Sequence, residues 1–126
     1  MKLQESMFAV AVVTVLVIGS GSAAADQAAA APDAATIAKG ATLFTAQKCM
    51  MCHSLDGKGN VKGPLNGVGT KLTAEEIRLW IVDPADMTKK TSATRKPAMR
   101  QYPNLAKGDV NALVAFLMTK RTTTSR

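Results

Sequence analysis

The sequence Cys-Met-Met-Cys-His at positions 49–53 contains both cysteines and the only histidine of the 126-residue chain. Thiol and imidazole chemistry is therefore confined to five consecutive residues. The two cysteines stand three apart, and the histidine directly follows the second one. Whatever these three side chains bind or form, the fold must bring the rest of the chain to this one place.

The first 25 residues are typical of a secretory signal peptide. A short polar start carrying Lys2 precedes an apolar run from Phe8 to Ile18, and small residues end in an Ala-x-Ala pattern at 23–25. This layout predicts cleavage before Asp26 and export to the periplasm. The alternative is an uncleaved membrane anchor, although the apolar run is shorter than the roughly 20 residues that a spanning helix needs.

The rest of the chain is strongly basic and poor in aromatic residues. The net charge is +7, and removing the leader leaves it unchanged because the leader carries one Lys and one Glu. A basic exported protein without an aromatic–basic stripe is a poor candidate for binding nucleic acid, so an acidic protein partner is expected. The chain has three Phe, one Trp and one Tyr. A core with so few aromatic side chains would gain stability from a large apolar ligand.

A first helix is predicted after Asp33, which is placed to cap it, and it ends near Lys48. Its apolar face has i, i+4, i+7 spacing and comprises Ile37, Ala41 and Phe44. Gly40 lies close to this face. Since a mid-helix glycine costs about 1 kcal/mol relative to alanine, it usually marks a close contact.

Two further helices are predicted. Thr73 and Glu76 form a capping box for a helix that ends near Val82, where Pro84 stops it. An apolar stripe begins at Val110 and predicts the last helix. Residues 83–108 show no pattern, and a loop of roughly that length in a small domain is usually functional. No alternating strand pattern is found.

The predicted organisation is a signal peptide over 1–25, a flexible Ala-rich lead-in over 26–33, one all-α domain over 34–121 and a flexible tail over 122–126. Three main helices joined by long loops are too little secondary structure to close a core unaided. Something besides the chain is therefore expected to fill the middle of the domain.

Four interpretations of the 49–53 motif were weighed. A zinc site lacks a second cluster of Cys or His ligands. A thioredoxin-like dithiol lacks its βαβ setting. A disulfide would close a loop too short to add much stability. Covalent haem attachment fits, because two cysteines three apart can bond the two vinyl groups while the next imidazole ligates the iron. The motif thus predicts one haem c held by Cys49, Cys52 and His53.

With this motif in place, residues 34–121 resemble the class I c-type cytochromes, small single-haem bacterial electron carriers. In that family a Gly-x-x-x-aromatic helix precedes the haem motif and crosses the last helix. Gly40 and Phe44 match the first of these helices, and Phe116 matches the second. The resemblance implies an all-α, cytochrome c-like fold wrapped around the haem.

The resemblance also assigns two supporting residues. Gly-Pro-x-Leu follows the haem motif in the family, and "GPLNGVG" at 63–69 matches it. It implies that the Pro64 carbonyl accepts the proton of the second nitrogen of His53. Trp80 resembles the family tryptophan whose ring N–H bonds a haem propionate. A plain core tryptophan is the alternative for Trp80.

Methionine is the natural second ligand in a chain with a single histidine. Of the seven methionines, two lie in the leader, two lie within the attachment motif, and Met118 reads as core filler. Met87 and Met99 remain. The resemblance favours Met99, because "RKPAMRQYPNL" matches the family's Lys-x-x-Met-Pro-x-Tyr loop. Arg100 stands where proline usually follows the ligand, which predicts a more labile Met99–iron bond and a somewhat raised potential.

A haem with both axial positions filled by protein has no open site for a substrate, so the expected function is one-electron transfer and not enzymatic catalysis. We expect a monomeric periplasmic carrier that meets redox partners with acidic docking surfaces. The alternatives are a haem subunit of a larger oxidoreductase, which a retained leader would tether to the membrane, and a haem gas sensor. A cationic rim for docking is predicted from Lys58, Lys62, Lys71, Lys89, Lys90, Arg95, Lys96 and Arg100.

Overall fold

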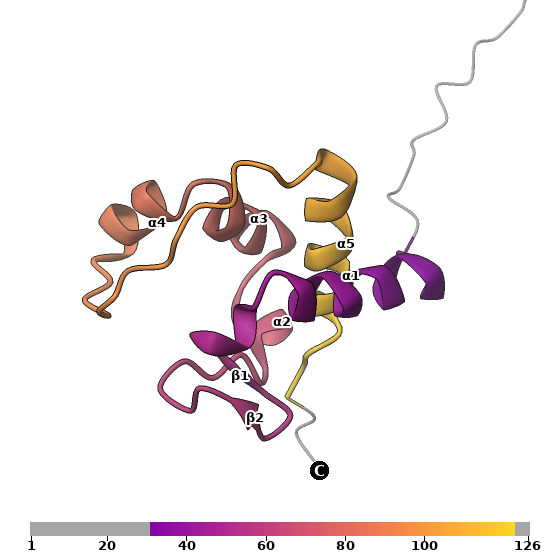
Figure 1. Ribbon diagram of the computed structural model, residues 1–126, viewed down its shortest axis with the longest axis horizontal. Coiled ribbons are helices and arrows are strands. Elements are labelled where there is room, and N and C mark those ends of the chain that lie inside the picture. Colours follow the sequence, from indigo (N-terminus) through magenta and orange to yellow (C-terminus); the bar gives the residue numbers. More distant parts are fainter. Residues whose placement is uncertain (1–30, 123–126) are drawn as a thin grey trace, which may run out of the picture. The chain divides into compact units, whose positions relative to one another are not determined.

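Two helices cross closely and organise the domain (Figure 1). Helix α1 spans Ala34–Ala46, and helix α5 spans Lys107–Met118. A Cβ atom added to Gly40 would overlap the carbonyl oxygen of Ala112, so the two backbones approach to a distance that only glycine permits here. Beside the crossing, the rings of Phe44 and Phe116 pack with their centroids 5.7 Å apart. The predicted close contact at Gly40 is confirmed.

The computed structural model describes residues 31–122, and the predicted signal peptide, most of the lead-in and the end of the tail lie outside this range. Between the two crossing helices the order is a 3₁₀ turn η1 (Cys49–Met51), strands β1 (Ser54–Leu55) and β2 (Lys58–Gly59), and helices α2 (Val68–Lys71), α3 (Ala74–Val82) and α4 (Pro84–Thr91). The strands form a two-stranded antiparallel hairpin. Within residues 31–122, no helix is long and apolar enough to cross a membrane.

The helix starts follow local sequence signals. The Asp33 carboxylate accepts the Thr36 N–H at 2.7 Å and so caps α1. Thr73 and Glu76 form the predicted reciprocal capping box of α3. Ala106, the N-cap residue of α5, offers no side-chain hydrogen bond, but Asp109 lies in the first turn, where a negative charge is favourable.

The segment after Val82 corrects one prediction. Pro84 was expected to end the middle helix and open a long loop, but a further helix, α4, starts at Pro84 itself. Asp83 ends α3 and caps α4 through the Asp86 N–H at 3.1 Å. Proline suits the first position of a helix because its missing N–H needs no partner there. With α4 and the short helix α2, the described residues contain five α-helices instead of the three main helices predicted.

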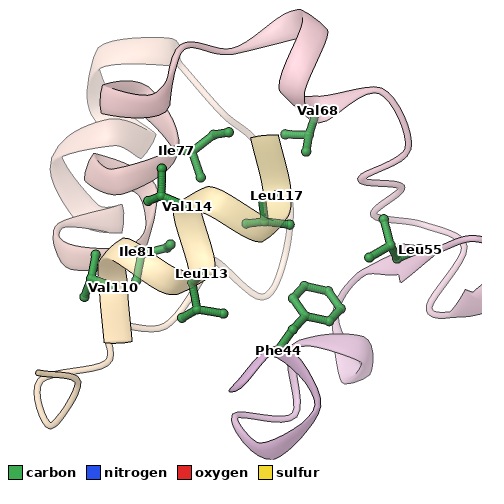
Figure 2. Packing of buried hydrophobic residues seen from close by; sticks show 9 residues of the cluster. All are labelled: Phe44, Leu55, Val68, Ile77, Ile81, Val110, Leu113, Val114 and Leu117. Atoms are coloured by element: carbon green, nitrogen blue, oxygen red, sulfur yellow. The ribbon is translucent and has the colours of Figure 1, made fainter. Parts of the chain in front are cut away.

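The core packs around α5 and draws on most elements of the domain (Figure 2). Helix α5 contacts α1, α2 and α3, so it is the common partner of the fold. The buried cluster consists of Phe44, Leu55, Val68, Ile77, Ile81, Val110, Leu113, Val114 and Leu117. Its only aromatic member is Phe44, which agrees with the thin core expected from composition.

We expect Gly40→Ala to lower the free energy of unfolding by about 1–3 kcal/mol, the usual cost of overpacking. Alanine is the better helix former by about 1 kcal/mol, but its methyl group would push the α5 backbone away. Urea unfolding of the purified protein measures the difference. Gly108→Ala is the matched control, because a Cβ there meets nothing within 4 Å. Equal effects of the two substitutions would contradict the close crossing.

Candidate functional site

A cavity of about 420 Å³ opens beside the core and is lined mainly by apolar side chains. This volume falls within the roughly 300–1,000 Å³ typical of small-molecule and cofactor sites. The lining residues come from all five helices, the 49–53 motif, the loop before α2 and the segment after α4. They include Phe44, Cys49, Cys52, His53, Trp80, Met99, Tyr102, Leu113 and Leu117. The structure thus brings the whole thiol and imidazole set of the chain to one apolar cavity.

The 49–53 motif is shaped by a sharp change of direction after α1. Lys48 adopts a left-handed backbone with φ 57°, which ends the helix and starts the 3₁₀ turn η1. The Cys49 carbonyl then accepts the N–H groups of Cys52 at 3.1 Å and His53 at 2.9 Å. This tight turn places both thiols and the imidazole against the cavity. No disulfide joins the two cysteines, so both sulfur atoms are available for another bond.

His53 is held through one ring nitrogen. Its Nδ1 lies 3.1 Å from the Gly63 carbonyl oxygen, and because a carbonyl can only accept, Nδ1 carries the proton and Nε2 keeps its lone pair. Burial lowers the pKa of His53, and the Arg95 charge lowers it further against the opposing effect of the Gly63 bond. The ring is therefore poised as neutral imidazole, the form that ligates metals.

The identity of this acceptor corrects the prediction that Pro64 would supply it. Ser54 forms a parallel bridge with Pro64. In this bridge the Ser54 N–H bonds the Gly63 carbonyl at 3.0 Å, while the Ser54 carbonyl accepts the Leu65 N–H at 2.9 Å. This register turns the Gly63 carbonyl toward the histidine next to Ser54. Pro64 itself lines the cavity.

The two candidate methionines occupy different places. Met99 is half-buried and lines the cavity together with His53. Met87 lies on α4 with only 3% of its surface exposed and is not part of the cavity wall. The structure therefore brings Met99, and not Met87, to the site that holds the motif.

Comparison with known proteins agrees with this arrangement. A sequence profile of the family described as Cytochrome c matches residues 37–121. The chain belongs to the cytochrome c family. This cytochrome is accordingly a haem-binding electron-transfer protein, and its two cysteines have the spacing for covalent haem c. Searches of curated proteins and of solved structures found no match.

The cavity of this cytochrome fits a haem on chemical grounds. Its wall is mainly apolar, as a porphyrin face requires. Two thiols and a neutral imidazole reach it from the 49–53 motif, and a methionine reaches it from the segment after α4. Burial raises the pKa of the Cys49 thiol, against an opposing effect from Tyr102. Cys52 is exposed, so the motif meets solvent at its second cysteine. The donor set matches soft and borderline ligands for iron.

Sequence reasoning missed three contributors to the site of this cytochrome. Gly63 supplies the carbonyl for His53. Arg95, predicted only as a surface cation, lines the cavity and donates a hydrogen bond to the Cys52 carbonyl. Tyr102, quoted only as part of a loop motif, is a half-buried lining residue. Trp80 reaches the cavity from α3, as a residue bonding a propionate would need to.

Proposed function

We propose that this cytochrome is an exported one-electron carrier whose haem is bonded to Cys49 and Cys52 and ligated by His53 and Met99. The observation that supports this proposal is the convergence of these four side chains on one apolar cavity. When bound, the haem supplies a ferric–ferrous couple, which the soft methionine sulfur biases toward the ferrous state. With His53 and Met99 both holding the iron, the chain would leave no open position for a substrate, and electron exchange would be the function.

In this proposal the residues around the ligands orient the ligand side chains and keep water out of the cavity. The Gly63 carbonyl orients the His53 ring and strengthens its donation through the remaining nitrogen. Phe44, Leu113 and Leu117 keep water from one part of the cavity. Trp80 is available to donate its ring N–H to a haem propionate.

We expect Met99→Ala to remove the weak methionine–iron charge-transfer band and to let the ferrous protein bind carbon monoxide at once. The wild type and Met87→Ala should both keep a six-coordinate low-spin spectrum and resist carbon monoxide, because Met87 is buried away from the cavity. Absorption spectra of the three haem-loaded proteins, oxidised and reduced, with and without carbon monoxide, measure this.

Each contrary spectrum points to a definite alternative. A high-spin wild type that takes up carbon monoxide readily would contradict the closed site and favour a gas sensor. Loss of the band in Met87→Ala alone would keep the carrier and transfer the ligand role to Met87.

We further propose that residues 1–25 are a cleaved signal peptide and that the carrier works in the periplasm. The support comes from the sequence, in which a short apolar run ends in an Ala-x-Ala pattern before Asp26. In the periplasm, cysteines that serve no other purpose are oxidised to disulfides. Covalent bonds to a haem would give Cys49 and Cys52 such a purpose, so the motif fits this compartment. A retained leader would instead favour a membrane-tethered haem subunit.

We expect the protein from a periplasmic extract to have the mass of a chain beginning at Asp26 plus one haem, measured under denaturing conditions. The double variant Cys49→Ala/Cys52→Ala should lose the haem increment, because no thiol remains to hold it. Met51→Ala, within the same motif, should keep it. A full-length mass in the membrane fraction would overturn both cleavage and free carriage.

The proposed electron-exchange surface lies at the exposed end of the motif. Cys52 is exposed there, and Met51 and Val61 expose 67% and 79% of their surface. The Asn60 side chain ties the two loops together by donating to the Met51 carbonyl at 3.1 Å. Lys58 and Lys62 are exposed on the same loop. An apolar centre with flanking cations suits brief encounters with acidic redox partners.

We expect Lys58→Glu/Lys62→Glu to slow oxidation of the ferrous protein by ferricyanide several-fold at low salt, because the anion is no longer attracted to this edge. The effect should vanish near 1 M salt, where the screening length is about 3 Å. Stopped-flow absorption measures the rate. The control is Lys39→Glu/Lys107→Glu, an equal charge change on α1 and at the start of α5, two elements that do not carry Lys58 or Lys62. Equal slowing would show an effect of net charge alone.

A further inference from the structure

Arg100 joins the segment that carries Met99 to the end of α1. Its Nη2 donates a hydrogen bond of 3.0 Å to the carbonyl oxygen of Gln47. Gln47 is the residue that ends α1, two positions before Cys49. The Arg100 guanidinium carbon also lies 5.0 Å from the centroid of the Tyr102 ring. One side chain therefore contacts both the turn leading into the haem motif and its own loop.

These contacts suit arginine in particular. The carbonyls at a helix C-terminus lack intrahelical partners and carry partial negative charge, so a cation that donates to them is favourable. A guanidinium is planar and can donate at its edge while its face lies over an aromatic ring. Lysine can make the first contact but not the planar stacking.

We propose that Arg100 is a positioning residue that keeps Met99 at the cavity by fastening its loop to the end of α1. The proposal rests on the proposed ligation by Met99. Proline, usual at this position in the class I cytochromes, would stiffen the backbone of the loop. Arg100 instead restrains the loop through a side-chain contact with a residue 53 positions away in sequence. The Arg100 contact thereby keeps the loop closed, although the loop lacks the proline ring at this position.

The hydrogen bond between Arg100 and Gln47 shifts the equilibrium between a closed and an open state of the loop that carries Met99. The Gln47–Arg100 bond exists only when the loop lies against α1, so it favours the closed state alone. Removing it raises the open population, and the apparent rate of any ligand that needs the open state rises in proportion. Carbon monoxide is such a ligand for ferrous iron whose sixth position is otherwise taken by methionine.

We expect ferrous, haem-loaded Arg100→Gln to bind carbon monoxide about five- to tenfold faster than the wild type, which is within the net effect of losing one solvent-exposed hydrogen bond. Arg100→Lys should fall between the two, since it keeps a donor and loses the stacking. Lys107→Gln removes an exposed cation at the start of α5, outside the predicted docking rim, and should match the wild type. Stopped-flow absorption gives the rates, and the charge-transfer band reports methionine ligation in each variant.

Three results would overturn the proposal. The first is that Arg100→Gln binds carbon monoxide as slowly as the wild type, and the second is that Lys107→Gln accelerates carbon monoxide binding as much as Arg100→Gln does. The third is that Arg100→Lys matches Arg100→Gln both in its carbon monoxide rate and in a lowered urea midpoint. Met99→Ala, measured beside them, separates this inference from the proposed function. If Met99→Ala opens the site while Arg100→Gln does not, only the role of Arg100 fails. If Met99→Ala changes nothing, the ligation itself fails.

Discussion

The close crossing of α1 and α5 at Gly40 is the contact on which the rest of the structure depends. It requires a residue without a side chain facing the Ala112 carbonyl. Once the backbones meet there, Phe44 lies one turn further along α1, and Leu113 and Leu117 of α5 share with it both the core and the cavity wall. The crossing also fixes the position of α1 against α5, and the haem motif follows the end of this helix after Lys48.

The side chains of this cytochrome fill only part of the domain interior, and a cofactor would fill the rest. The buried cluster contains one aromatic residue, and a cavity of about 420 Å³ lies beside it. Apolar walls around so large a space are unfavourable in water but match a porphyrin. A ligand that binds only the folded chain stabilises it by mass action. Covalent attachment would make that stabilisation independent of haem concentration.

Local signals in the sequence predicted the parts of the fold that depend on neighbouring residues. The Asp33 cap, the Thr73–Glu76 capping box and the spacing of Gly40 and Phe44 all appear in the structure. The prediction at Pro84 was wrong because the same proline that ends one helix can begin another. Composition alone does not distinguish these two roles.

Contacts between distant residues were beyond the sequence patterns. The acceptor of His53 depends on the register of the bridge between Ser54 and Pro64, and a shift of one residue there changes which carbonyl faces the ring. The bond from Arg95 to the Cys52 carbonyl spans 43 positions. No spacing rule indicates such a partner, so an arginine of this kind is read as an ordinary surface cation.

The positions of the two arginines change how the basic charge of this cytochrome is understood. Arg95 donates to the Cys52 carbonyl and Arg100 to the Gln47 carbonyl, so the segment after α4 is fastened on both sides of the motif. Guanidinium groups held by main-chain oxygens have part of their donor capacity committed within the protein. A partner would then depend mainly on lysines such as Lys58 and Lys62, whose ammonium groups stay hydrated and mobile. Arginine would serve the ligand loop, and lysine the brief encounters of electron transfer.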